Sequence, residues 1–378
     1  MEQDANADTG PLRRGWTTGS CATAASKAAF TALRTGQFPD PVTITLPNGR
    51  AVAFALAETA HHGEVAQAGI VKDAGDDPDV THGALIRASV RLLPPGAGIL
   101  FRAGEGVGTI TRPGLPLPPG EPAINPTPRA MIRAALAEAA GGTPPDAEVT
   151  LSVPGGERLA ERTLNGRLGI VGGLSILGTT GIVVPFSCAA WIDSIRRGID
   201  VARAIGLDHV AGSTGAVSER AVQRLHGLPD TALIEMGDFA GGMLKYLRDH
   251  PVRRVTVAGG VAKITKLSQG FLDLHSRRGA ADLPALASVA IEAGGTADLA
   301  AGIANANTVA QAFELAASAG IELGNVIASR ARQVAADVLR GSNTTIEIVL
   351  FDRDGRLVGQ TGDKHPGALP LDPAQGSP

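Results

Sequence analysis

Hydrophobic and polar residues alternate over short distances in the first 160 residues, which is typical of strands with one buried face. The apolar runs 42–46 and 51–57 flank an Asn48-Gly49 turn, a strong signal for a β-hairpin. An alanine-rich run at 21–33 has high helix propensity. Further strands are expected at 84–93, 98–103 and 148–153, and one amphipathic helix is expected at 129–140. This part of the chain is therefore predicted to be a mixed α+β domain.

The pattern changes after about residue 160, where apolar runs that end in small residues alternate with helical segments. Strand, small-residue turn and helix in repetition predict a parallel, Rossmann-like sheet with helices on its faces. Ligands of such sheets bind at the carboxyl ends of the strands, so the turns there are candidate site loops. These turns are Ser213-Thr214-Gly215, Gly237-Asp238 and Gly259-Gly260. The runs lie at 209–212, 232–236 and 255–258, alanine-rich helices at 281–339, and a closing hairpin at 344–359.

We therefore expect an α/β protein of two domains, as its length of 378 residues also suggests. Residues 13–160 would form the α+β domain with its hairpins and Gly/Pro-rich loops. Residues 161–362 would form the Rossmann-like α/β domain, with a helical C-terminal part, and the boundary is expected near 157–166. Residues 1–12 and 363–378 are expected to be disordered tails.

The stretch 166–187 contains six glycines, and the 25 residues from 168 to 192 carry no charge. A run of this length first suggests a membrane span. The glycines, together with Thr179, Thr180 and Pro185, lower helix stability and argue against a span. We expect two short buried strands instead, at 168–171 and 181–184, around a loop of bare backbone that a ligand can approach.

Composition narrows the class of protein further. Apolar residues make up 44% of the chain and aromatic residues only 3%, so the cores must be built from Ala, Val, Leu and Ile. The net charge of −3, without a basic block, disfavours a nucleic-acid partner. Two cysteines, Cys21 and Cys188, support no disulfide framework, and the first residues lack the features of a signal peptide. The expected location is cytoplasmic.

Candidate chemistry begins at Thr17-Thr18-Gly19-Ser20, which precedes the 21–33 helix. Exposed amides at such a helix start can bind an anion, with Lys27 one or two turns further on. The alternative is an ordinary helix start that is capped by Thr18 or Ser20. Cys21, in the first turn, is either a thiol of lowered pKa or a small buried thiol.

A second candidate loop, Gly104-Glu105-Gly106-Val107-Gly108-Thr109, follows one of the expected strands. Its glycine spacing is similar to that of dinucleotide-binding loops, but residues 110–114 do not open a helix. The Rossmann fingerprint requires that helix. We expect a flexible, amide-rich loop in which Glu105 accepts hydrogen bonds from a ribose diol.

A proline-rich strap at 115–128 leads into the 129–140 helix, with Thr127 as the expected N-cap and Pro128 as the first residue. Arg129 and Arg133 lie one turn apart, which suits either a carboxylate-rich partner or a solvated helix face. The acidic segment 72–79 lacks the ligand spacing of a calcium loop. A solvated turn, or a polar rim that binds a ligand hydroxyl, is expected there rather than a metal site.

Lys263 and Lys266 lie three residues apart after the third turn, and His275 and Arg277-Arg278 follow. A cationic edge at strand ends suits an anionic substrate. A helix with routine surface charges is the alternative reading.

Several of these stretches together resemble the CbiD family, the cobalt-precorrin-5B C(1)-methyltransferases of anaerobic cobalamin synthesis. The resemblance covers about 13–359, with one departure, Ala262, where the family has glycine before Lys263. It implies S-adenosylmethionine as methyl donor, a cobalt-containing tetrapyrrole as acceptor, cobalt-precorrin-6A as product, and a two-domain α/β fold. The stretches that carry it are 15–21 (GWTTGSC), 104–109, 120–129 (GEPAINPTPR), 166–187 and 263–276.

The resemblance assigns no catalytic residue, and it requires no protein metal site because cobalt arrives with the substrate. A homodimer is an open possibility, and no membrane partner is expected. Two other functions stay open on the residues alone, a nicotinamide-dependent oxidoreductase and a non-catalytic corrinoid-binding protein. The residues expected to bind the donor are Gly104, Glu105, Gly106, Gly108, Thr109, Gly172, Gly173, Thr179 and Thr180. Those expected to bind the substrate are Thr17, Thr18, Gly19, Ser20, Asn125, Arg129, Lys263, Lys266 and His275.

Overall fold

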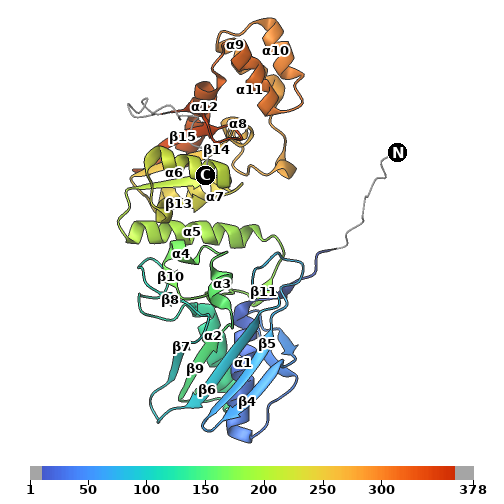
Figure 1. The fold of residues 1–378 in the computed structure, drawn as a ribbon, viewed down its shortest axis with the longest axis vertical. Helices are drawn as coiled ribbons and strands as arrows, with labels where there is room; N and C mark the ends of the chain where they lie inside the picture. Colours follow the sequence, from blue (N-terminus) through green and yellow to red (C-terminus); the bar gives the residue numbers. More distant parts are fainter. Residues whose placement is uncertain (1–10, 362–378) are drawn as a thin grey trace, which may run out of the picture. The chain divides into compact units, whose positions relative to one another are not determined.

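A computed structural model describes residues 11–361, so the expected tails lie outside the described residues except for positions 11 and 12. The chain forms two compact units that divide between Cys188 and Ala189 (Figure 1). We call them the N-terminal unit and the C-terminal unit. The division falls later than the expected boundary at 157–166, because strands of the glycine-rich stretch pair with the N-terminal unit.

The N-terminal unit is built on a five-stranded sheet in the order β4-β5-β6-β9-β7 (Figure 1). All neighbours are antiparallel except β7 and β9, which are parallel. Buried and half-buried positions alternate in β9, as expected for a sheet with one face on the core. That core includes buried side chains of the helices α1, Thr18–Thr35, and α2, Pro126–Ala139. The strands are β4 Glu58–His62, β5 Val65–Val71, β6 Leu85–Leu92, β7 Ile99–Ala103 and β9 Ala147–Ser152.

Three two-stranded pieces complete this unit. The expected hairpin is confirmed as β2, Val42–Thr45, and β3, Ala51–Phe54. The two strands expected in the glycine-rich stretch are shorter than predicted and only partly buried, and they do not pair with each other. Instead β10, Ile170–Val171, pairs with β8, Thr109–Ile110, and β11, Ile182–Val183, pairs with β1, Gly15–Trp16. Two short helices that were not expected are α3 Gly156–Ala160 and α4 Asn165–Leu168.

Both helix starts in the N-terminal unit lie earlier than expected. The N-cap of α1 is Thr17, whose hydroxyl accepts from the Ser20 amide at 3.2 Å, and neither Thr18 nor Ser20 has that role. The N-cap of α2 is Asn125 rather than Thr127, so that two prolines fall in the first turn, where their missing N–H groups cost no helical hydrogen bond.

The C-terminal unit confirms the predicted Rossmann-like sheet, with the order β13-β12-β14-β15-β16. The first four strands are parallel, and β16 is antiparallel at the edge. Numbered along the chain within this unit, the order is 2-1-3-4-5, a doubly wound arrangement. The strands are β12 His209–Ser213, β13 Leu233–Glu235, β14 Arg254–Gly260, β15 Thr345–Phe351 and β16 Leu357–Gln360.

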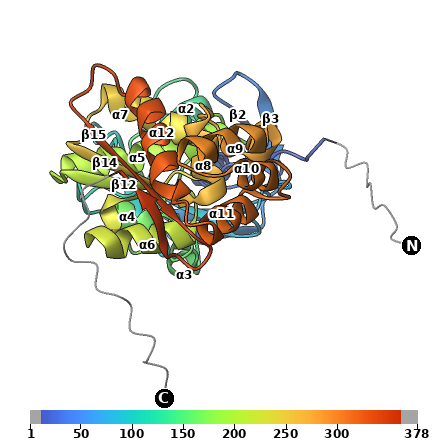
Figure 2. The same ribbon diagram turned by 90° about the horizontal axis from the view of Figure 1, so that it is seen from above.

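Helices cover both faces of this sheet (Figure 2). The helix α6, Ala216–His226, packs with Ala211 and Val349 in a small apolar cluster on one face. The larger core on the other face takes side chains from the remaining helices and from Val210 and Val257. Those helices are α5 Cys188–Ala204, α7 Ala240–Asp249, α8 Val261–Ser268, α9 Leu283–Glu292, α10 Ala297–Ala304, α11 Val309–Ser318 and α12 Leu323–Val338.

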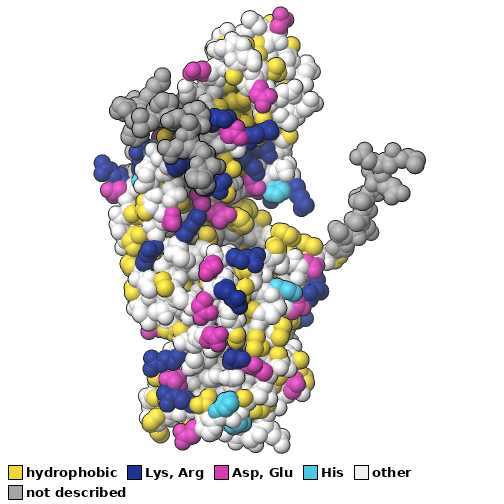
Figure 3. Space-filling model, viewed as in Figure 1, with side chains coloured by type: hydrophobic (Ala, Val, Ile, Leu, Met, Phe, Trp, Pro, Cys, Tyr) yellow, Lys and Arg dark blue, Asp and Glu magenta, His cyan; other side chains and the backbone are white. Residues whose placement is uncertain are grey.

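Within residues 11–361, no helix is both long enough and apolar enough to cross a membrane. On the face drawn in Figure 3, basic and acidic side chains are interspersed over most of the surface.

Candidate functional site

The glycines of the 104–109 loop leave no room for a Cβ, which would meet the Ser152 side chain at Gly104, the Ile170 side chain at Gly108 and the backbone at Gly106. A Cβ on Gly106 would lie 2.0 Å from the carbonyl oxygen of Val153. A Cβ on Gly156 would lie 2.3 Å from the carbonyl oxygen of Gly106, and one on Gly173 would lie 2.3 Å from the same peptide group. We call Gly106, Gly156 and Gly173 the glycine triad. It joins the candidate loop to the start of α3 and to the glycine-rich stretch.

The glycine amides of this loop are already used within the chain. Gly104 donates to the Leu151 carbonyl at 2.8 Å, and Gly108 donates to the Leu174 carbonyl at 2.8 Å. The Gly106 amide donates to the Glu157 carboxylate at 2.7 Å. A ligand at this loop would therefore have to use other groups. The exposed side chain of Glu105 is one such group.

The segment Thr17–Ser20 is hydrogen-bonded to the glycine-rich stretch. The Thr18 hydroxyl donates to the Leu177 carbonyl at 3.0 Å, and the Ser20 hydroxyl donates to the Gly181 carbonyl at 2.7 Å. The Gly19 amide also donates to Leu177, at 3.0 Å. The start of α1 is thus the ordinary capped helix, and its amides are not open to an anion.

Cys21 and Lys27, which follow this segment in α1, also have structural roles. Burial raises the pKa of the Cys21 thiol to about 12, so Cys21 is the small buried thiol and not an activated one. Lys27 donates to the Thr43 carbonyl at 2.7 Å and pairs with Glu138 at 2.9 Å, and is therefore engaged elsewhere.

Asn125 and Arg129 belong to the same assembly. The Asn125 amide donates to the Ile176 carbonyl at 2.9 Å. The Arg129 guanidinium donates to two backbone carbonyls, pairs with Glu121 at 2.8 Å and lies over the Phe101 ring. The structure thus brings together four segments of this unit that were predicted from the sequence to carry the site: 17–20, 104–109, 120–129 and 166–187. Their exposed members are Glu105, Gly172, Thr179 and Thr180.

The carboxylates of the acidic segment 72–79 have partners within the N-terminal unit, although Asp76 is exposed to solvent; binding of a ligand hydroxyl there stays a prediction. The buried Lys72 ammonium pairs with Asp79 at 2.5 Å. Arg13 hydrogen bonds to Asp73 and holds the pKa of that carboxyl at about 2. Asp76 accepts from the Arg13 amide at 2.6 Å. These carboxylates fasten the residues before β1 to the N-terminal unit.

In the C-terminal unit, the three predicted turns lie at one edge of the sheet, because β12, β13 and β14 are parallel. The predicted Gly259-Gly260 turn is the end of β14, and α8 begins at the next residue. The turn after β12 lies against this strand end, since the Thr214 amide donates to the Ala258 carbonyl at 3.0 Å. These strands are first and third along the chain in the order 2-1-3-4-5, so the point where the strand order reverses lies between them. We call this edge the carboxyl edge.

Lys263 and Lys266 share one side of α8, as expected, but their partners are internal. Lys263 forms an ion pair with Asp238 and donates to the Leu274 carbonyl at 3.2 Å. The buried Lys266 donates to the carbonyls of Leu274 and His275 at 3.2 and 3.3 Å. His275 is exposed, and its ring accepts from the Arg277 amide at 3.1 Å. Of the two lysines, Lys263 keeps the more exposed side chain, at 34%.

Three residues at the carboxyl edge were missed as individual site candidates. Asp238 and Ser213 were predicted only to belong to candidate site loops. Nothing in the sequence indicated that the hydroxyl of Ser213 is buried and has no hydrogen-bond partner within the described residues. Trp191 of α5 is 43% exposed, and its indole donates to the Glu235 carbonyl at 3.0 Å beside Gly237. No spacing signal links α5 to that turn.

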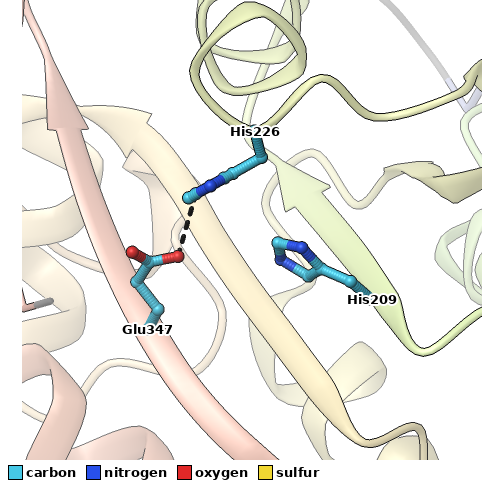
Figure 4. A group of neighbouring side chains, drawn as sticks. All are labelled: His209, His226 and Glu347. Atoms are coloured by element: carbon cyan, nitrogen blue, oxygen red, sulfur yellow. Dashed lines mark ion pairs between the residues drawn. The ribbon is translucent and has the colours of Figure 1, made fainter. Parts of the chain in front are cut away.

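A second missed group, His209, His226 and Glu347, lies toward the amino ends of the parallel strands (Figure 4). Glu347 pairs with His226 at 2.9 Å and also accepts from Thr256 and Arg254, at 2.6 and 2.8 Å. Burial by itself raises the pKa of Glu347, but these partners outweigh burial and lower the pKa to about 2. Burial, with the Arg254 charge, lowers the pKa of His209 to about 4.

Two histidines and a carboxylate are also a ligand set for zinc or iron. One oxygen of Glu347 already has three protein donors, one of them the Arg254 cation. A metal bound there at about 2.0–2.2 Å would have to displace these donors. We interpret the group as an ion-pair network that joins the end of α6 to the sheet.

Comparison with known proteins gives the same family at both ends of the chain. A family model described as CbiD matches residues 5–185, and one described as CbiD, C-terminal domain, matches residues 273–362. An enzyme named cobalt-precorrin-5B C(1)-methyltransferase from Agrobacterium fabrum is 64% identical over 350 residues, which cover 93% of each chain. Enzymes of the same name from Bradyrhizobium sp. and Halorhodospira halophila are 63% and 61% identical, and each match covers 93% of this chain and 94% or 95% of the relative.

A solved structure, titled as cobalamin biosynthesis protein (cbiD) from Archaeoglobus fulgidus, is 24% identical and covers 82% of this chain and 85% of its own. The TM-score is 0.37, and a likeness this low supports no inference about the present fold.

The glycine triad predicts a contrast between two helical glycines. Gly156→Ala would place a Cβ 2.3 Å from the Gly106 oxygen, whereas Gly166→Ala meets nothing within 4 Å. We expect Gly156→Ala to lower the free energy of unfolding by about 2–3 kcal/mol, as overpacking does. Gly166→Ala should leave it unchanged or raise it by about 0.4–1 kcal/mol. Urea denaturation, followed by Trp16 fluorescence in a Trp191→Phe background, measures both. Equal changes in the free energy of unfolding of the two variants would contradict the close contact between Gly156 and Gly106.

The ion-pair network predicts acid sensitivity of the C-terminal unit. The folded pKa of His209, about 4, lies below its ordinary 6.5, and that of Glu347, about 2, lies below 4.5. The unfolded chain therefore takes up protons first, and stability falls as the pH drops from about 6.5 through 4 and further toward 2. The His209 contribution should be on the order of 2–3 kcal/mol.

His209→Leu should flatten the part of this dependence above pH 4, measured by urea denaturation with Trp191 fluorescence in a Trp16→Phe background. His62→Gln, at an exposed position of the N-terminal unit, is the control and should keep the slope. If the free energy of unfolding of His209→Leu depended on pH as steeply as that of the parent protein, another group would be responsible for the acid sensitivity.

Proposed function

Because this chain belongs to the CbiD family, we propose that it transfers a methyl group to C-1 of cobalt-precorrin-5B and forms cobalt-precorrin-6A. The observation that carries this proposal is the 64% identity, over 93% of both chains, to an enzyme named for that reaction. S-adenosylmethionine is the proposed donor, and the cobalt is part of the tetrapyrrole substrate.

The proposed chemistry needs no reactive protein side chain. The nucleophilic ring carbon attacks the methyl carbon in line, the bond from sulfur to that carbon breaks, and S-adenosylhomocysteine leaves as a neutral thioether. Positioning of the two reactants and exclusion of water can supply most of the acceleration. Cys21, with its pKa raised to about 12 by burial, is unsuited to be a nucleophile, which is consistent with this mechanism.

For the donor, we propose Glu105 as the partner of the ribose hydroxyls, and Thr179 and Thr180 of the glycine-rich stretch as further contacts. All three side chains are exposed, whereas Gly104, Gly106, Gly108 and Gly173 have structural contacts. We propose that those glycines position the site and do not themselves donate to the ligand.

For the substrate, we propose Lys263 and His275 as contacts to its carboxylates. The side chain of Lys263 is 34% exposed, and His275 is exposed. Lys266, Arg129 and the segment Thr17–Ser20 are engaged by backbone groups, so we propose that they hold the surrounding segments in place.

The alternative of a nicotinamide-dependent oxidoreductase has weaker support. The segment after Gly104–Thr109 continues from β8 into an irregular strap and opens no helix, so the dinucleotide fingerprint is incomplete. We also propose a cytoplasmic location, which is supported by the two cysteines, Cys21 and Cys188, both free thiols.

Incubation with S-adenosylmethionine and cobalt-precorrin-5B tests the function directly. We expect the tetrapyrrole to gain one methyl group, detected by mass spectrometry, and a donor with a 13C-labelled methyl should place that label in the product. Replacing the donor by S-adenosylhomocysteine is the control. A tetrapyrrole of unchanged mass would refute the proposal and leave the corrinoid-binding alternative.

Glu105→Ala tests the donor assignment. Loss of a charge-assisted hydrogen bond should weaken the binding of S-adenosylhomocysteine about tenfold or more, measured by calorimetry. Glu64→Ala removes another exposed carboxylate of the same unit and should leave the affinity unchanged. If Glu105→Ala binds as tightly as Glu64→Ala, the ribose assignment fails.

A further inference from the structure

Two helices begin at the carboxyl edge without side-chain caps. The N-cap residues of α6 and α8 are Gly215 and Gly260, and no side chain caps the first-turn amides of either helix. The Ser218 hydroxyl donates to the Gly215 carbonyl at 2.8 Å and so uses no amide. The first-turn amides at 216–218 and 261–263 donate no hydrogen bond to any group within residues 11–361. Such amides, with the positive end of the helix dipole behind them, favour an anion.

The two helix starts are adjacent and unobstructed. A Cβ on Gly259 would lie 2.9 Å from a side-chain atom of Thr214, which shows how closely the turn after β12 approaches the end of β14. A Cβ on Gly215 or on Gly260 would meet nothing within 4 Å. These two glycines therefore face open space, unlike the glycine triad.

A buried hydroxyl supplies an independent sign of a ligand. Ser213, the last residue of β12, is 1% exposed, and its Oγ has no hydrogen-bond partner within the described residues. Side chains two residues apart on a strand share one face, and Ala211 packs against Ala221 and Val222 of α6. Ser213 therefore points toward the α6 side, beside the start of that helix. A buried polar group without a partner is uncommon and destabilising.

The charges around this edge are compatible with an anion. Asp238, in the turn after β13, is neutralised by its ion pair with Lys263 in the first turn of α8. The first turn of α8 has no acidic residue, and the acidic residue in the first turn of α6 is Glu219.

We propose that the starts of α6 and α8, together with the Ser213 hydroxyl, bind a carboxylate group of a small-molecule ligand. The choice of carboxylate rests on the proposed function, because S-adenosylmethionine and the tetrapyrrole both carry carboxylates and neither carries a phosphate. The site lies where the strand order reverses, the position at which doubly wound sheets bind their ligands. Which of the two ligands supplies the carboxylate is decided by the experiment.

Gly260→Asp is the sharpest test. Gly260 has φ −69° and ψ 156°, the geometry of an ordinary N-cap, so an aspartate can adopt it and cap α8. We expect the variant to be more stable, with Tm higher by about 2–4 °C, and to bind the ligand about tenfold more weakly because its own carboxylate occupies the amides. Gly260→Ala adds a Cβ without a charge and should bind within about threefold of the wild type.

A pair of serine variants separates ligand binding from stability. Ser213→Ala removes a hydroxyl without a partner, so Tm should stay the same or rise while affinity falls about three- to tenfold. Ser26→Ala removes a buried hydroxyl that donates to the Ala22 carbonyl at 2.7 Å in the N-terminal unit. Its Tm should fall while its affinity is unchanged.

Three probes are titrated into the full-length protein and these variants. S-adenosylhomocysteine is measured by calorimetry, cobalt-precorrin-5B by absorbance, and citrate, a carboxylate unrelated to either, by its effect on Tm. Weaker binding of the first or the second probe to Gly260→Asp and Ser213→Ala supports the site and identifies its ligand. If all three probes act on both variants as on the wild type, the site is refuted.

Failure of the proposed function gives a different result. If neither S-adenosylhomocysteine nor cobalt-precorrin-5B binds the wild type, a rise in Tm with citrate that Gly260→Asp abolishes still supports a carboxylate site. The absence of any citrate effect, together with no binding of the other two probes, refutes the site as well.

Discussion

Contact between bare peptide groups is the constraint on which the N-terminal unit depends. Gly106, Gly156 and Gly173 approach one another so closely that no side chain fits between them. This contact ties the strand-end loop, the start of α3 and the glycine-rich stretch into one piece. It also places β10 beside β8, and so the compact unit extends to Cys188, well past the last strand of its sheet. The exposed groups Glu105 and Thr179 are carried on a rigid support as a result.

The C-terminal unit separates its two kinds of polar group along the strand direction. Toward the amino ends, one oxygen of Glu347 contacts His226, Thr256 and Arg254, and these partners lower the pKa of the carboxyl to about 2. At the carboxyl ends, backbone amides and the Ser213 hydroxyl have no partner within residues 11–361. Satisfied groups stabilise a sheet, whereas unsatisfied donors at the ligand-binding edge are a cost that a bound anion removes.

Much of the fold could be predicted from the sequence, because its signals are local. The Asn48-Gly49 turn, the alanine-rich helices and the runs ending in glycine all specify structure within a few residues. The β4–β5 hairpin escaped prediction because its inward positions include Ala66 and Ala68, which have low strand propensity, and β4 is largely exposed. The site was less predictable for a different reason. The partners of His209 and Lys263, Thr256 and Asp238, lie on other elements, and spacing along the chain does not show them.

Glycine itself illustrates why a motif and a binding site must be distinguished. In the sequence, Gly104–Thr109 and Gly259-Gly260 both follow a strand and both suggest amides that a ligand can reach. In the first case other protein atoms fill the space of the missing Cβ, and the amides of Gly104, Gly106 and Gly108 donate within the chain. At Gly260 the missing Cβ leaves open space, and the helix start beyond it has free donors. The number of glycines does not distinguish the two cases. A glycine whose Cβ would clash with protein atoms is needed for packing, whereas a glycine whose Cβ would meet open space leaves room for a ligand.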